Sequence, residues 1–276
     1  MKKKIADFLL TFVLFYAGVL ALLFFAQREM MYHPTGPRPS AEELGIPTPQ
    51  TVRVQADDGL EIEGWYWPPE NSDGPVMVYF HGNGQDYPYW TGKIMQYRRA
   101  MGLGVLLAEY RGYGGNPGHP TEAGLMADAR AYIGWLQREQ GVPPSRMIFN
   151  GESLGTGIAV RMAAEFAPRA VILESPYSST AAIAQGRYFF APVSLLMLDQ
   201  FRSIDVIGEV KSPNLFMHAV QDTIIRIAFS RELYEAAAEP KQFIEIPQGG
   251  HNDLYENGAF AHGKAFIEEV LGKAGN

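Results

Sequence analysis

The feature that most constrains this chain is a pentapeptide at residues 151–155, Gly-Glu-Ser-Leu-Gly. Apolar residues 147–149 precede it and a helix-compatible stretch, 158–166, follows it, so it stands between a predicted strand and a predicted helix. A sharp turn there forces its central residue into a strained backbone conformation, and flanking glycines let strand and helix approach closely. The pattern predicts that Ser153 projects its hydroxyl above the sheet as a nucleophile. A glycine-rich turn with an incidental serine is the alternative.

Two possible partners of this serine follow it in the chain. Asp222 lies in a loop after the apolar stretch 214–218, and His251 follows the apolar stretch 243–246 and two glycines. Nucleophile, acid and base in this order, each just past a predicted strand, are much harder to obtain by chance than one pentapeptide. We therefore predict a catalytic triad in which His251 is the base for Ser153 and Asp222 orients it. Two other aspartates precede the strand that should deliver the acid and are weaker candidates: Asp199 and Asp205.

With two glycine-containing loops, 81–84 (His-Gly-Asn-Gly) and 110–114 (Tyr-Arg-Gly-Tyr-Gly), these residues resemble the α/β-hydrolase superfamily. Within it the chain looks most similar to membrane-anchored abhydrolase-domain serine hydrolases, which include acyl-protein thioesterases and serine-aminopeptidase-like proteins. The resemblance spans roughly residues 31–271. It implies an α/β fold with a mostly parallel central sheet, helices on its flanks and a small cap insertion. It departs near the acid, where Ala219 and Arg226 replace the glycine and proline that relatives often carry.

The resemblance also implies an oxyanion hole made of two backbone N–H groups. One belongs to Leu154, directly after the nucleophile, and the other to Asn83 in the loop after the predicted strand 76–80. Such donors, aimed at the developing negative oxygen, are often the largest electrostatic contribution to acyl transfer. His81 in the same loop is a rival base, but its place beside glycines is more typical of a residue that supports the loop.

An apolar run near the N-terminus predicts a membrane helix. The run from Phe8 to Ala26 is uncharged over 19 residues, and a helix of this length comes close to the ~30 Å thickness of a bilayer's hydrocarbon core. A cleaved signal peptide is the alternative, but the run exceeds a usual signal h-region and no clear small-x-small site precedes Gln27. We predict a membrane anchor over residues 1–30 and a hydrolase domain over residues 31–276.

Charge bias predicts the orientation of this anchor. Lys2, Lys3 and Lys4 precede the apolar run, whereas one arginine and one glutamate follow it. Positive charge stays preferentially on the cytoplasmic side. We expect a cytoplasmic N-terminus and an exported hydrolase domain, which in a bacterium faces the periplasm.

Composition narrows the partners and cofactors. The formal net charge is −7 and no basic stripe is visible, which argues against a nucleic-acid partner. The chain has no cysteine, which excludes disulfides, thiolate catalysis and a cysteine-based metal site. A serine triad needs neither a metal nor an organic cofactor, so we expect none.

The resemblance implies a cap over the nucleophile between the predicted strand 170–173 and the acid. The segment 178–212 is rich in aromatic, leucine and methionine side chains, which suit an acyl chain or another apolar substrate. Plain core packing or a membrane-facing surface explains the same composition equally well, because apolar helices do not reveal which surface they cover.

Three functions fit the sequence. The first is an esterase or thioesterase that forms an acyl-enzyme and acts on a small-molecule or lipid-like acyl substrate near the membrane. The second is a peptidase of the serine-aminopeptidase type, which needs an acidic pocket for the substrate amine, and no clear one is evident. The third is a non-catalytic, membrane-tethered interaction protein, which would be expected to lose a member of the triad, and none is lost.

Overall fold

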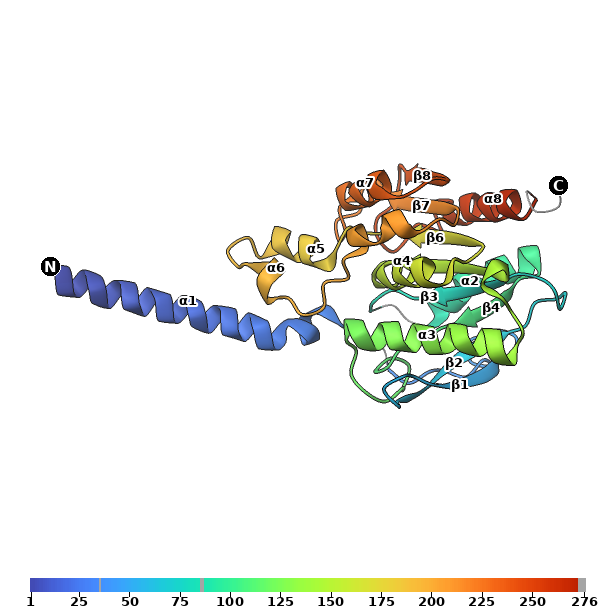
Figure 1. The fold of residues 1–276 in the computed structure, drawn as a ribbon, viewed down its shortest axis with the longest axis horizontal. Coiled ribbons are helices and arrows are strands. Elements are labelled where there is room, and N and C mark those ends of the chain that lie inside the picture. The colour runs from blue at the N-terminus through green and yellow to red at the C-terminus, as the bar shows by residue number, and fades with distance from the viewer. Residues whose placement is uncertain (35, 85–86, 273–276) are drawn as a thin grey trace.

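The centre of the molecule is an eight-stranded sheet in the order β1-β2-β4-β3-β5-β6-β7-β8 (Figure 1). The computed structural model describes residues 1–34, 36–84 and 87–272. The strands are β1 (Gln50–Gln55), β2 (Glu61–Trp67), β3 (Val76–Phe80), β4 (Gly104–Leu107), β5 (Met147–Glu152), β6 (Ala170–Glu174), β7 (Asn214–Ala219) and β8 (Lys241–Ile246). The pairs β1–β2 and β2–β4 are antiparallel, and every other neighbouring pair is parallel.

Helices cover both faces of this sheet. The helices α3 (Glu122–Glu139), α4 (Leu154–Phe166) and α7 (Ile227–Ala236) pack into one core, and α2 (Tyr87–Met101) and α8 (Ala259–Gly272) pack into a second core on the opposite face. Because both faces are covered, every residue of the central strands β3, β5, β6 and β7 is buried. The predicted α/β architecture, a mostly parallel sheet flanked by helices, is confirmed.

The helix α1 (Lys2–Met31) extends away from the sheet as a single rod (Figure 1). None of its residues is fully buried, and it is long and apolar enough to cross a bilayer, a property that signal sequences share. The half-buried side chains near its C-terminal end recur every three or four residues and so share one face of the helix. They are Tyr16, Val19, Leu20, Leu23, Phe24, Ala26, Gln27 and Met31.

Residues 178–212 lie beside the end of α1 that is nearest the sheet (Figure 1). They form the helices α5 (Thr180–Arg187) and α6 (Val193–Leu196) and two 3-10 turns, Ser203–Asp205 and Ile207–Glu209. The side chain of Ser179 caps α5 by accepting a hydrogen bond from the N–H of Ala182. Leu20 and Leu23 of α1 pack against a small apolar cluster of this segment, made of Ala181, Ala191 and Val193.

Candidate active site

The carboxyl ends of four parallel strands gather the predicted site residues. Asn83 follows β3, Ser153 follows β5, Asp222 follows β7 and His251 follows β8. The strands β3 and β5 are neighbours, but their next strands, β4 and β6, lie on opposite sides of them. In open α/β sheets a ligand crevice forms at such a reversal of strand order. The topology alone therefore places these four residues around one crevice.

Ser153 occupies the sharp turn between β5 and α4. Its backbone has φ 48° and ψ −116°, a conformation that non-glycine residues rarely adopt, and its N–H donates to the carbonyl of Glu174 at 2.9 Å. A Cβ atom on Gly151 would lie 2.6 Å from the carbonyl oxygen of Gly155, and one on Gly155 would lie 2.0 Å from that of Phe80. Both positions therefore require glycine for the reason that the sequence pattern indicates.

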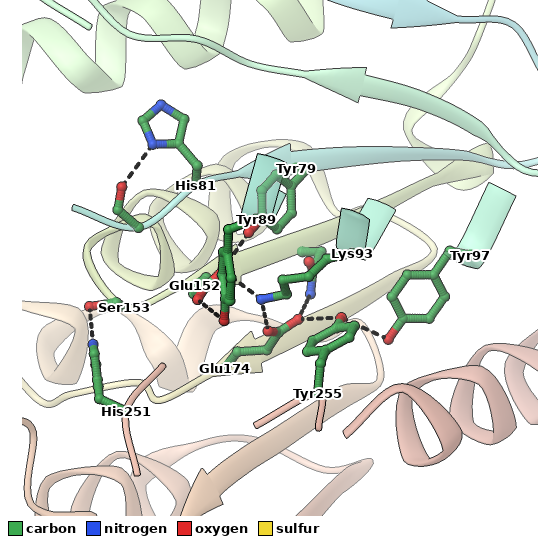
Figure 2. A network of polar contacts seen from close by, with 12 residues as sticks. Tyr79, His81, Tyr89, Lys93, Tyr97, Glu152, Ser153, Glu174, His251 and Tyr255 are labelled. Atoms are coloured by element: carbon green, nitrogen blue, oxygen red, sulfur yellow. Dashed lines mark hydrogen bonds and ion pairs between the residues drawn. The ribbon is translucent and has the colours of Figure 1, made fainter. Parts of the chain in front are cut away.

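Hydrogen bonds join Ser153, His251 and Asp222 in series. His251 Nε2 lies 2.9 Å from Ser153 Oγ, and His251 Nδ1 lies 2.7 Å from Asp222 Oδ2 (Figure 2 shows the serine and histidine). An ionised carboxylate only accepts, so Nδ1 carries the proton and Nε2 is left to accept from the serine. Burial opposes ionisation of Asp222, but hydrogen bonds from His218 and His251 outweigh it and hold the pKa of this carboxyl well below its ordinary value.

His218 is a second histidine on Asp222, and the sequence reasoning gave it no part in the site. Its fully buried Nε2 lies 2.8 Å from the carbonyl oxygen of Ile225 and 3.2 Å from Asp222 Oδ2, while Nδ1 lies 2.5 Å from Ser230 Oγ. Asp222 Oδ1 also accepts from the N–H groups of Ile224 and Ile225 at 2.8 Å each. These contacts fix the loop that carries the acid. A histidine near the end of a mostly apolar strand, four positions before an aspartate, is the signal that could have identified it.

The rival residues have other partners. His81 is fully buried with its Nε2 2.9 Å from Glu109 Oε1, and its ring points away from Ser153 (Figure 2). The rings of Trp90 and Tyr110 flank it with centroids at 4.0 Å each. His81 therefore supports its loop, as its place beside glycines indicates. The two rival acids form ion pairs elsewhere, Asp199 with Arg28 and Asp205 with Arg202.

The two predicted oxyanion donors border the same cavity as Ser153. Leu154 is the first residue of α4, where backbone N–H groups are free of intrahelical partners and the helix dipole favours negative charge. The side chain of Asn83 is held in place by three hydrogen bonds. Its Nδ2 donates to the carbonyl of Met31 at 2.5 Å, and its Oδ1 accepts from the N–H of His33 at 2.8 Å and from Tyr113 Oη at 2.7 Å. The loop that carries Asn83 is thereby attached to the last residue of α1.

Beneath the elbow lies a buried cluster of charged and phenolic side chains (Figure 2). Lys93 Nζ of α2 lies 2.5 Å from Glu152 Oε2 and 2.5 Å from Glu174 Oε2. Tyr79 and Tyr89 donate to the carboxylate of Glu152. The carboxylate of Glu174 accepts from two further groups: Tyr255 Oη at 3.0 Å and Asn150 Nδ2 at 2.9 Å.

The cluster is held together by opposite charges in a dry environment. Burial opposes the charge on Lys93, but the two glutamates outweigh it and keep the pKa of this ammonium above its ordinary value. Burial raises the pKa of Glu174 despite the neighbouring ammonium. Glu152 immediately precedes Ser153, and the carbonyl of Glu174 accepts the Ser153 N–H. The cluster therefore supports the backbone of the elbow from below. We call it the lower cluster: Tyr79, Tyr89, Lys93, Asn150, Glu152, Glu174 and Tyr255.

A cavity of about 510 Å³ opens above Ser153. The seryl and histidyl side chains lie at its wall with Asn83 and Leu154, and most of the remaining wall comes from α1 and residues 178–212. Among the residues that the structure describes, no aspartate or glutamate lines it. Its apolar lining includes Leu23, Phe24, Met30, Met31, Ile183, Val193, Leu196, Met197, Ile224 and Ile225. In the described ranges no group of three or more His, Asp or Glu side chains has the arrangement of a metal site.

Comparisons with known proteins agree with this architecture. Residues 75–202 match the family model described as the alpha/beta hydrolase fold. An uncharacterized protein of Mycobacterium tuberculosis is 39% identical over 239 residues, which cover 86% of this chain and 84% of that protein. The human alpha/beta hydrolase domain-containing protein 17B is 30% identical over 197 residues, covering 71% of this chain and 67% of that protein. Among solved structures, an esterase from Pyrococcus furiosus superposes with a TM-score of 0.69 at 17% identity and covers 88% of this chain and 98% of its own.

Proposed function

The chain belongs to the α/β-hydrolase family, and we propose that it is a serine hydrolase that cleaves ester or thioester bonds through an acyl-enzyme. The fold and its esterase neighbours support hydrolase activity. One observation supports the finer assignment: Ser153, in a strained turn, shares a hydrogen bond with His251, whose other ring nitrogen meets a buried carboxylate. This is the arrangement that makes a serine hydroxyl nucleophilic at neutral pH.

In the proposed acylation step, Ser153 Oγ attacks the substrate carbonyl and its proton passes to His251 Nε2. Asp222 keeps the imidazole in the tautomer that can accept this proton and stabilises the imidazolium that forms. The negative charge that develops on the carbonyl oxygen is met by the backbone N–H groups of Asn83 and Leu154. His251 then protonates the departing alcohol or thiol, and the acyl group remains on the serine.

Deacylation repeats this sequence with water as the nucleophile. His251 takes a proton from the water, the hydroxide oxygen bonds to the acyl carbon, and the serine oxygen leaves with the proton that the imidazole returns. The products are the carboxylic acid and free Ser153. Every group that this step uses is one of the chain's own.

The cavity lining favours an acyl substrate over the substrate of an aminopeptidase. A free amino terminus is a cation and calls for a carboxylate in the pocket, but the described lining residues include no aspartate or glutamate. Apolar side chains instead make up much of the lining above the serine, as suits an acyl chain, and Arg187, which also lines it, would repel a substrate cation. We propose that residues 178–212 act as a cap over this space.

The activity is tested by fluorophosphonate labelling of the purified full-length protein together with hydrolysis of p-nitrophenyl esters. We expect the parent to label and turn over, and Ser153→Ala and His251→Ala to do neither. Ser175→Ala is the matched control, because Ser175 also ends a central strand with a positive φ of 51° yet does not line the cavity. A folded parent that neither labels nor hydrolyses any ester would overturn the enzyme proposal in favour of the interaction protein.

We further propose that α1 is an uncleaved anchor with its N-terminus in the cytoplasm. The lysines before the apolar run and the contacts of α1 with the folded body support this proposal. Because the chain has no cysteine, single introduced cysteines give an unambiguous test. An impermeant maleimide applied to intact cells should label Asp73→Cys, whose parent side chain is 91% exposed, but not Lys3→Cys. The reverse pattern would invert the orientation.

A further inference from the structure

We infer that α1 forms one wall of the acyl-binding pocket, and that the pocket receives the long acyl chain of a lipid ester directly from the bilayer. This inference rests on the proposed function and adds to it a substrate class and a route of entry. The membrane helix then has two roles, as an anchor and as part of the substrate-binding site.

Residues of α1 line the cavity that contains the proposed catalytic serine. Leu23, Phe24, Gln27, Met30 and Met31 of α1 line the same cavity as Ser153 and His251. The facing wall comes from α5, α6 and their connection; most of its side chains are apolar, and Thr180 and Arg187 of α5 also line it. Without α1 one side of this cavity would be open, so a soluble body without the helix would lack a complete channel for an acyl chain.

Specific polar contacts hold α1 against the body. Arg28 Nε lies 2.7 Å from Asp199 Oδ2, and Gln27 Oε1 accepts the N–H of Leu198 at 2.7 Å. Tyr16 Oη donates to the carbonyl of Phe190 at 2.6 Å. The bond from Asn83 to the carbonyl of Met31 ties the end of α1 to the loop of the predicted oxyanion hole. The helix is thus attached at both ends of the cavity.

Part of the cavity lies at the depth of the apolar run of α1. Leu23 and Phe24 line the cavity and belong to the apolar run that ends at Ala26, whereas Arg28 and Glu29 are the first charges after it. At 1.5 Å per residue, Leu23 lies about 4.5 Å inside the end of that run. The outer part of the cavity therefore lies at the level of lipid chains.

The surface around this opening is apolar as well. Phe189 and Leu195 are 82% and 83% exposed, and Phe190 and Leu198 are also exposed. They project from the segment that packs against α1. Exposed apolar side chains gathered beside a membrane helix are typical of a surface that enters the bilayer. An acyl chain can then pass from the lipid phase to Ser153 without crossing water.

The test compares two adjacent leucines on α1. Leu23 lines the cavity, while Leu22 is 69% exposed on the lipid side and does not line it. Full-length parent, Leu23→Trp and Leu22→Trp are reconstituted in vesicles of non-hydrolysable ether lipids and assayed with p-nitrophenyl acetate and the C8, C12 and C16 esters. In the parent we expect kcat/KM to rise by up to about fourfold per methylene until the cavity is filled. We expect Leu23→Trp to lose about tenfold or more on the C12 ester, the equivalent of about two buried methylenes, and to lose much less on the acetate.

The outcomes separate the inference from the proposed function. Superimposable chain-length profiles of Leu23→Trp and Leu22→Trp, in an active enzyme, would overturn the role of α1 and leave the hydrolase proposal standing. Absence of fluorophosphonate labelling and of acetate turnover in the parent would instead overturn the proposed function itself. Surface dilution tests the route: rates on the C16 ester that follow its mole fraction in the vesicles support entry from the bilayer, and rates that follow its bulk concentration contradict it.

Discussion

The two sides of Ser153 differ in chemistry: charged and phenolic groups lie below it, and many apolar side chains line the space above it. Below the serine, the lower cluster buries an ammonium, two carboxylates and the Tyr79 phenol and half-buries the phenols of Tyr89 and Tyr255, and each of these groups contacts another (Figure 2). Above it, many of the side chains that line the cavity are apolar, and most of these belong to α1 and residues 178–212. The lower side fixes the backbone of the elbow, and the upper side determines what reaches its hydroxyl. The position and the selectivity of this one nucleophile are therefore set by separate parts of the fold.

The largest expected effect is on activity and comes from the acid beside the cavity. Asp222→Asn places an amide on His251 Nδ1, which favours the wrong imidazole tautomer, and we expect kcat to fall by about 10⁴-fold. Fluorophosphonate labelling rates and ester hydrolysis measure it. In urea unfolding, Asp222→Asn should lose much less stability than Lys93→Met, a variant of the lower cluster. Near-parental activity in the folded variant would reassign the acid.

The second effect is on stability. Lys93→Met leaves Glu152 and Glu174 buried without their cation, and we expect the free energy of unfolding to fall by about 3–5 kcal/mol. Urea titration in detergent, followed by tryptophan fluorescence, measures it. The variant Lys93→Met with Glu152→Gln and Glu174→Gln removes all three charges together and should recover part of the loss. Equal stability of Lys93→Met and the parent would contradict the structural role of the lower cluster.

The third effect concerns pH. Because the folded state holds the pKa of Asp222 below its unfolded value of about 3.9, the carboxylate contributes stability above that value, and this is lost as the pH falls toward the folded pKa. Between pH 7 and pH 3 the parent should therefore lose about 1 kcal/mol more than Asp222→Asn, in which this titration is absent. Urea midpoints of both proteins at the two pH values test the sign. An equal loss in both proteins would contradict the assigned shift.

The smallest effect on stability is expected from the ion pair between Arg28 of α1 and Asp199. The Arg28 side chain is 46% exposed, so Arg28→Gln should cost at most about 1 kcal/mol of unfolding free energy. It should nevertheless change the preference among ester chain lengths, because it loosens one wall of the cavity. Acetate turnover is the internal control. A loss of stability as large as that of Lys93→Met would mean that the upper side is as tightly built as the lower.

The sequence predicted the parts of the site that are local. The pentapeptide predicts Ser153 directly. Asp222 and His251 each follow a recognisable apolar strand, and because these strands are parallel, both residues lie at the same edge of the sheet as Ser153. The mostly parallel sheet with helices on its flanks was expected from the resemblance to α/β-hydrolases, whereas the order of its strands was not predicted.

The lower cluster and the α1 wall escaped prediction for physical reasons. Lys93, Glu152 and Glu174 come from α2, β5 and β6, and each alone is an ordinary charged residue. Only the packing of those elements shows that the three charges meet in a dry interior. Similarly, Leu23 and Leu22 are identical in the sequence, and nothing in the apolar run shows which of them faces a cavity and which faces lipid.

The bond between Asn83 and the last residue of α1 has a consequence for biogenesis. A newly made chain whose first helix is still held by the export machinery cannot place that helix against its cavity. We therefore expect its activity on long-chain esters to be low until insertion is complete. Cell-free translation tests this: a long-chain fluorophosphonate should label the product made with acceptor vesicles faster than the product made without them, whereas a short-chain probe should distinguish them less. The long-chain activity of this hydrolase would then appear only on its arrival in the membrane.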